Sequence, residues 1–166
     1  MTRTAAKLML GAICVSCAFG AIAWSIAWAT PGVGVGRTTI SGPVTFDEIN
    51  VFVHNPLQRV RLQTEGFSDV YVLEVTVAPG GQTGWHAHPG PAFVSVKAGV
   101  ATEYSGEDPN CTPVVHLAGT GFMEVPGHVH NVRNEGTVPL DVVVLYILPV
   151  GAPVRIDVPN PGNCPF

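Results

Sequence analysis

Apolar and polar side chains alternate along short segments of this chain, with turn-forming residues between the segments. The clearest segment is residues 70–78, where Val and Leu alternate with Tyr, Glu and Thr before Pro79, Gly80 and Gly81. Such alternation places every second side chain on one face of a β-strand. Further strands are predicted at residues 51–53, 60–63, 92–97, 100–104, 114–117, 121–125, 129–133 and 138–149. No window of helical length after residue 43 has a 3.6-residue period, so the pattern predicts an all-β sandwich, jelly roll or barrel.

The N-terminal segment differs from the rest of the chain. Arg3 and Lys7 precede a run without charge from residue 8 to residue 29, which ends in Ala27-Trp28-Ala29. This order is typical of an export signal with an A-x-A cleavage site, and the run is also long enough for an uncleaved membrane anchor. Both interpretations place the remainder outside the cytoplasm. We therefore divide the chain into a signal peptide or membrane anchor (1–29), a linker or irregular edge (30–43) and a β domain (44–166).

Composition narrows the range of partners. The chain has a net charge of −4 and only 12% charged residues, with no basic cluster after Lys7. A nucleic-acid surface needs clustered Lys and Arg, so nucleic acid is not an expected partner. The 19 Gly and 15 Pro residues are spread through the chain, as an all-β domain with many turns requires.

Two histidine-containing stretches carry the candidate chemistry. His86 and His88 are one residue apart in a β-rich context, so both side chains point to the same face and can reach one metal ion. A second cluster, His128 and His130, follows about forty residues downstream.

These stretches resemble the two sequence motifs of the cupin superfamily, in particular small exported bacterial cupin-domain proteins. The first motif is matched by Gly80, His86, His88 and Gly99, and the second by Gly119, Gly127, His130 and Asn134. Two slots differ: the glutamate slot of the first motif holds Ala92, and the proline slot of the second holds Val125, with Pro126 one place later. The resemblance covers residues 70–149.

The resemblance implies a double-stranded β-helix, or jelly-roll barrel, with a divalent metal held by His86, His88 and His130. An Ala methyl group cannot be a ligand, but a three-histidine site still suits Fe, Zn, Cu or Ni. His128 is an alternative fourth ligand, whereas Glu103 and Glu124 are expected to face solvent. Loss of the metal with retention of the barrel is the other interpretation of Ala92.

The remaining candidates have structural interpretations. His54 and His116 lie outside both motifs and are expected to be structural or exposed, and Trp85 and Tyr104 are expected at the cavity mouth, in the core or on the surface. Cys111 and Cys164 favour a disulfide in an exported domain, with metal ligation as the alternative.

Three functions remain open at this point. The first is a metal-dependent enzyme that performs dioxygenation or isomerisation of a small molecule. The second is a non-catalytic module that binds a small ligand, and the third is an envelope protein that keeps only the barrel. A homodimer is a further expectation, and it rests on the resemblance alone.

Overall fold

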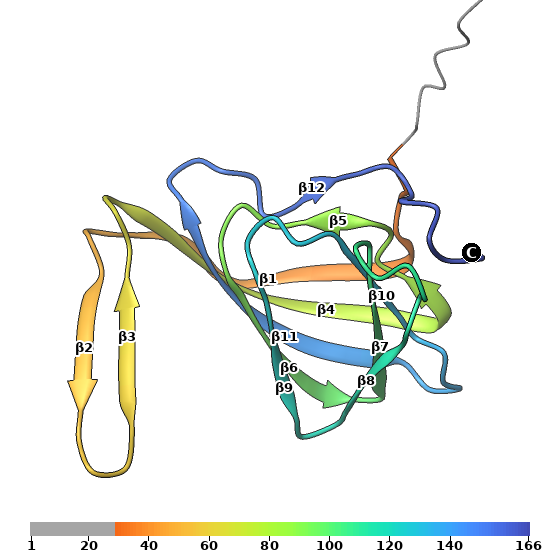
Figure 1. The fold of residues 1–166 in the computed structure, drawn as a ribbon, viewed down its shortest axis with the longest axis horizontal. Helices are drawn as coiled ribbons and strands as arrows, with labels where there is room; N and C mark the ends of the chain where they lie inside the picture. The colour runs from red at the N-terminus through yellow and green to blue at the C-terminus, as the bar shows by residue number, and fades with distance from the viewer. Residues whose placement is uncertain (1–28) are drawn as a thin grey trace, which may run out of the picture.

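The computed structural model describes residues 29–166, which form antiparallel β-strands and no helix (Figure 1). The strands are β1 (Val33–Phe46), β2 (Asn50–His54), β3 (Arg59–Gln63), β4 (Ser68–Gln82), β5 (His86–Ala87), β6 (Ala92–Ala98), β7 (Val100–Ser105), β8 (Val114–Leu117), β9 (Gly121–Glu124), β10 (His130–Arg133), β11 (Leu140–Pro149) and β12 (Ile156–Asp157). The all-β prediction is therefore confirmed. The predicted export signal or anchor lies outside the described residues, and within them no helix is long and apolar enough to cross a membrane.

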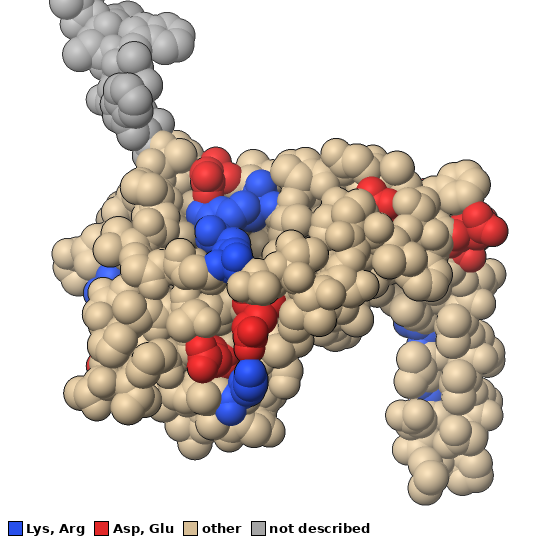
Figure 2. All heavy atoms as spheres, turned by 180° about the vertical axis from the view of Figure 1, so that it is seen from behind, with Lys and Arg blue, Asp and Glu red and all other residues tan. Residues whose placement is uncertain are grey.

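Ten of the strands form one sheet that curls into a nearly closed barrel. Its main path runs β12-β5-β10-β4-β11-β6-β9, with β1 paired to β4, and with β7 paired to β10 and β8. Strands β2 and β3 pair only with each other and project from the barrel as a hairpin (Figure 1). The surface seen in Figure 2 carries few charged groups, as expected from the composition.

Strand β1 corrects the predicted domain boundary. Residues 33–43, expected as a linker or an irregular edge, belong to β1, which pairs with β4 along most of its length. The pairing is interrupted by register shifts, as in an irregular edge strand. Because Arg37 and Thr39 of this strand line the central cavity, the barrel begins before residue 44.

The alternation within the strands separates the barrel interior from its surface. Leu73, Val75 and Val77 of β4 are buried, and β6 and β11 contribute a matching apolar row. This row is Ala92, Val94, Val96, Leu140, Val142 and Val144. Strands β4, β11 and β6 are hydrogen-bonded neighbours, so these side chains form one wall.

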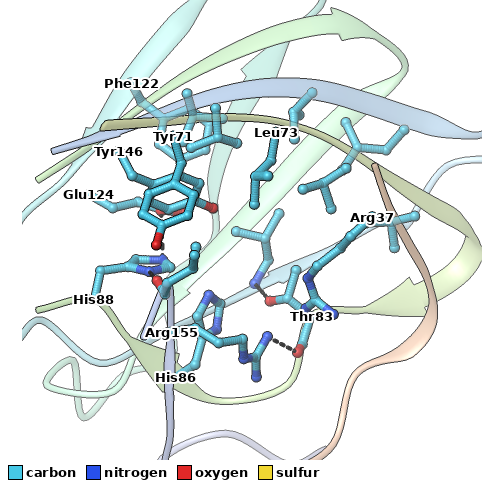
Figure 3. A pocket seen from close by; sticks show the side chains of 18 of the residues that line it. Arg37, Tyr71, Leu73, Thr83, His86, His88, Phe122, Glu124, Tyr146 and Arg155 are labelled. Carbon is cyan, nitrogen blue, oxygen red and sulfur yellow. Dashed lines mark hydrogen bonds and ion pairs between the residues drawn. The ribbon is translucent and has the colours of Figure 1, made fainter. Parts of the chain in front are cut away.

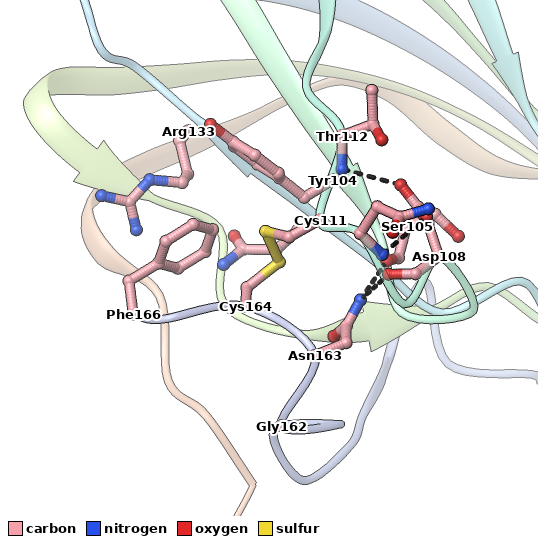
Figure 4. The surroundings of a disulfide bond; sticks show 12 residues. Tyr104, Ser105, Asp108, Cys111, Thr112, Arg133, Gly162, Asn163, Cys164 and Phe166 are labelled. Carbon is pink, nitrogen blue, oxygen red and sulfur yellow. Dashed lines mark hydrogen bonds between the residues drawn. A yellow bond between two sulfur atoms is a disulfide. The ribbon is translucent and has the colours of Figure 1, made fainter.

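A second, smaller core lies where the C-terminal tail returns to the barrel (Figure 4). Cys111 and Cys164 form a disulfide across a sequence separation of 53 residues. Phe166 lies against Trp85 and Tyr104, with ring centroids 6.4 and 4.9 Å away. Trp85 and Tyr104 therefore belong to this core and not to the cavity mouth.

Two motif residues have purely structural tasks. Asn134 is buried and donates hydrogen bonds to the carbonyl oxygens of Val77 and Val138, which ties the end of β10 to β4 and to the turn before β11. Gly99 has φ of +76°, and a Cβ there would lie 2.6 Å from the carbonyl oxygen of Pro139. Any other residue at position 99 is therefore strained by both backbone conformation and lack of space.

Candidate metal centre

The three motif histidines meet at one point because two short strands pair there. His86 lies on β5 and is paired directly with His130 of β10. His88 follows β5, and its carbonyl oxygen accepts a hydrogen bond of 2.9 Å from the Gly127 N–H, which joins the two motifs. All three rings are buried, and their ligand nitrogens lie within 4.8 Å of one another. The predicted convergence of these imidazoles is observed.

Each of these rings is held through its Nδ1 atom. The Nδ1 atoms of His86, His88 and His130 lie 2.8, 2.6 and 3.0 Å from backbone carbonyl oxygens. A carbonyl oxygen only accepts, so each Nδ1 carries the proton and each neutral ring has a lone pair on Nε2. Metal-binding histidines are usually oriented by this kind of hydrogen bond. The chain therefore presents three oriented Nε2 atoms to a shared space.

Glu124, at the end of β9, lies against two of these three histidines, although it is not among the residues whose ligand atoms all lie within 4.8 Å of one another. Its side chain is 6% exposed, and its Oε2 atom lies 3.1 Å from Nε2 of His88 (Figure 3). Its Oε1 atom lies 3.1 Å from Nε2 of His130. Neither Nε2 atom has a hydrogen-bond partner, so these contacts are ion-pair approaches without hydrogen-bond geometry. A carboxylate this close to two nitrogen lone pairs requires a cation between them, either a proton or a metal ion. Ligands about 2.0–2.2 Å from one metal lie roughly 3 Å apart when they occupy neighbouring positions.

The position of Glu124 corrects the sequence analysis. We expected this side chain to face solvent, whereas it is buried against the histidines. In the pairing of β6 with β9, Glu124 lies directly opposite Ala92, the residue in the glutamate slot of the first motif. The neighbouring strand thus places a carboxylate next to the histidines. One signal was present in the sequence: on β9, Glu124 shares a face with the half-buried Phe122, while Met123 between them is exposed.

The charges in this site depend on burial and on one another. Burial, followed by the electrostatic effects of His130, Arg155 and His88, lowers the pKa of His86 to about 2, so His86 is neutral at physiological pH. Burial favours the protonated carboxyl of Glu124, but His130 and His88 outweigh burial and hold its pKa below the usual range. Burial disfavours a charged His130, yet the adjacent Glu124 raises the pKa of this imidazole. Protonation of His130 and metal binding at its Nε2 atom would therefore compete.

The other candidate residues lie outside this cluster. His128, the alternative fourth ligand, directs its Nε2 to the Ser105 hydroxyl at 2.8 Å and is a rim residue hydrogen-bonded to a neighbouring strand. His116 pairs with Glu103 at 3.0 Å and stacks on Phe122 with ring centroids 3.8 Å apart. Glu103 is therefore half-buried rather than free in solvent, and His54 lies on the exposed β2–β3 hairpin.

A cavity of about 300 Å³ adjoins the histidines inside the barrel (Figure 3). It has the volume of about ten water molecules, at the lower end of small-molecule sites. Glu124, Tyr146 and two of the motif histidines line one part, aliphatic side chains of β4 and β11 form the wall, and Arg37 and Arg155 line another part. Burial raises the pKa of Tyr146, so its hydroxyl stays protonated and is a hydrogen-bond donor.

Comparison with known proteins agrees with this architecture. The sequence matches the cupin domain family over residues 73–146, and no curated protein matches it significantly. The polyketide cyclase RemF from Streptomyces resistomycificus has a TM-score of 0.54 and 13% identity, over 77% of this chain and 74% of that chain. An uncharacterised conserved protein with a double-stranded β-helix domain from Klebsiella pneumoniae has a TM-score of 0.45 and 24% identity, over 68% and 84% of the two chains. At such identities the likeness concerns the fold alone.

Proposed function

Because this chain is a member of the cupin superfamily, we propose that its barrel holds a divalent transition metal on His86, His88 and His130 and acts on a small molecule in the adjoining cavity. The observation that carries the proposal is the set of three buried imidazoles, each fixed through Nδ1 and each with Nε2 free. Nitrogen ligands of this kind suit Fe, Zn, Cu or Ni.

Glu124 is the fourth ligand in this proposal. Three neutral imidazoles and one carboxylate leave a divalent ion with one remaining positive charge, which favours a bound anion or an anionic intermediate. The carboxylate also explains how the chain tolerates Ala92 in the motif, because the two positions are cross-strand neighbours.

The reaction class that we propose is dioxygenation or isomerisation of a small molecule. The bound metal would supply an electrophilic centre that polarises an oxygen atom of the substrate or binds dioxygen. The chain itself orients the ligands, excludes water with its aliphatic wall and offers the Tyr146 hydroxyl as a donor. The RemF structure is named a cyclase, so at least one barrel of this fold is associated with chemistry on a small molecule.

A non-catalytic binding module is the second candidate function. Among the described residues that line the cavity, Glu124 is the sole carboxylate, and as a metal ligand it is not available as a general base. A reaction that needs a free carboxylate base is therefore disfavoured here. Binding without turnover requires no such group.

Metal content tests the proposal. The full-length chain is purified without added metal, titrated with Fe, Zn, Cu and Ni, and analysed for bound metal. We expect one ion per chain, lost in His88→Ala and retained in the control His116→Ala, whose ring lies in a similar contact with Glu103 outside the cluster. A wild-type chain that stays empty in every titration would disprove the metal function. Oxygen uptake with candidate substrates then separates the enzyme from the binding module.

We further propose that the domain lies outside the cytoplasm. The disulfide between Cys111 and Cys164 supports this location, since disulfides are rare in reducing compartments. The charge pattern before residue 30 supports it as well. Thiol alkylation of intact cells followed by fractionation tests the proposal: the expected result is a protected disulfide in the extracytoplasmic fraction.

The homodimer also remains a proposal. Its support is the projecting β2–β3 hairpin, where Phe52 and Leu57 are 68% and 94% exposed. Isolated two-stranded hairpins are at best marginally stable in water, so a partner surface would stabilise this one. Light scattering measures the mass of the wild type and of a Phe52→Ser, Leu57→Ser variant. A monomeric wild type would refute the dimer.

A further inference from the structure

Two arginines line the cavity from different parts of the chain. Arg37 is on the edge strand β1, and Arg155 is in the tail just before β12. Figure 3 shows both side chains directed into the cavity, with Arg155 close to His86. Burial, and then the charge of Arg155, lowers the pKa of Arg37, so the two cations are near enough to repel each other. Like charges placed together in a cavity point to an anion that binds between them.

The two arginines differ in the hydrogen bonds and ion pairs that they make within the chain. The Arg155 guanidinium donates from Nε to Asp157 and from an Nη atom to the carbonyl oxygen of Thr83, which fixes its plane. The second Nη atom also contacts Asp157, so three of the five donors of the group are engaged and two remain for a ligand. Arg37, by contrast, takes part in none of the ion pairs found among residues 29–166. Arg37 is exposed, so it lies where a ligand can enter.

The charge balance of the cavity favours an anion as well. Among the described residues, the carboxylate of Asp157 contacts Arg155 and also acts on Arg37, which leaves the two arginines together with one excess positive charge. At the metal centre, a divalent ion with Glu124 leaves another. Much of the remaining wall is aliphatic, formed by residues such as Leu73, Val142 and Val144. An apolar body with one anionic group would match both features.

We infer that the cavity binds small monocarboxylates, with the carboxylate held by Arg37 and Arg155 and the apolar body against the β4 and β11 wall. A planar carboxylate fits the fork of guanidinium donors in two-point fashion. This inference rests on the proposed function of the cavity, and it names the substrate class. The remaining part of the substrate would then lie next to the histidines.

A matched pair of probes tests the inference. Binding of hexanoate and of the uncharged hexanamide to the full-length chain is followed by NMR of the backbone amides, with chelator and with added Zn²⁺. We expect hexanoate to bind about tenfold to a hundredfold more tightly than hexanamide, since hydrogen bonds to a charged group are worth about 1.5–3 kcal/mol. Arg37→Met should remove this preference. The control Arg61→Met, on the exposed β2–β3 hairpin, should keep it.

The outcomes separate this inference from the metal proposal. A hexanoate preference that depends on Arg37 and persists with chelator supports the anion site even if no metal binds. Equal affinities for the two probes, no binding of either, or a preference that Arg37→Met leaves intact overturns the inference, while metal stoichiometry is judged independently. A stronger preference for inorganic phosphate than for hexanoate would also overturn it, because the apolar body would then contribute nothing.

Discussion

Replacement of Glu124 by Gln separates a metal ligand from a structural ion pair. If Glu124 is a ligand, Glu124→Gln removes the only anionic member of the site. Mutation of a residue that hydrogen-bonds to a metal ligand, without touching the metal itself, typically lowers metal affinity about tenfold to a hundredfold. A direct ligand should be worth at least the upper figure, so we expect an affinity loss of about 100-fold, which is about 2.7 kcal/mol.

The same substitution should leave the metal-free protein almost unaffected. The carboxylate lies 3.1 Å from two Nε2 atoms that have no hydrogen-bond partner, and a Gln amide group can donate to one of them. At a pH high enough for His130 to be neutral, we therefore expect the unfolding free energy of the metal-free variant to stay within about 1 kcal/mol of the wild type. A structural ion pair predicts the opposite, because breaking a buried pair costs about 3–5 kcal/mol.

Isothermal titration with Zn²⁺ and urea unfolding in chelator measure the two quantities. Glu103→Gln is the matched control, since it changes a half-buried carboxylate 3.0 Å from His116 and outside the cluster. Unchanged Zn²⁺ affinity in Glu124→Gln, together with a large loss of stability, would refute the ligand assignment.

Three further results are expected. Ala92→Glu, added to Glu124→Ala, should restore Zn²⁺ affinity to within about tenfold of the wild type, because the two positions are directly paired across β6 and β9; a titration that shows no recovery would count against the cross-strand exchange. Cys111→Ser with Cys164→Ser should lower the unfolding free energy by about 4 kcal/mol in urea, and a loss below about 1 kcal/mol would mean that the tail is held by its packing alone. Zn²⁺ affinity should fall as pH drops through and below the raised pKa of His130, since the metal must displace a proton that the folded protein holds there; a flat profile between pH 5 and pH 8 would contradict this linkage.

Local sequence patterns were sufficient to predict most of the barrel. Strands β4, β6 and β11 carry a two-residue alternation, and each has one face buried in the core, so burial and pattern agree. Strand β1 was missed because its Gly and Pro content is similar to that of a linker, and because its pairing partner β4 lies some thirty residues away in the sequence. Strands β5 and β12 have two residues each, too few to show a period.

In the candidate site, too, some residues were predicted from local patterns and others were missed. The histidines were predicted because the spacing within each motif is local. The resemblance to the cupin motifs then indicates which imidazole rings converge. Glu124 and Arg155 were missed as site residues because their positions depend on strand register and on the path of the tail. Alternation along β9 indicated which face Glu124 shares, but it could not indicate that this face meets the histidines of another strand.

X-ray anomalous scattering from crystals of the full-length chain soaked in Zn²⁺ tests the central claim most directly. The account predicts one strong peak about 2.0–2.2 Å from Nε2 of His86, His88 and His130 and from a carboxylate oxygen of Glu124. A peak elsewhere, or none at this position with Zn²⁺ in excess, would contradict it.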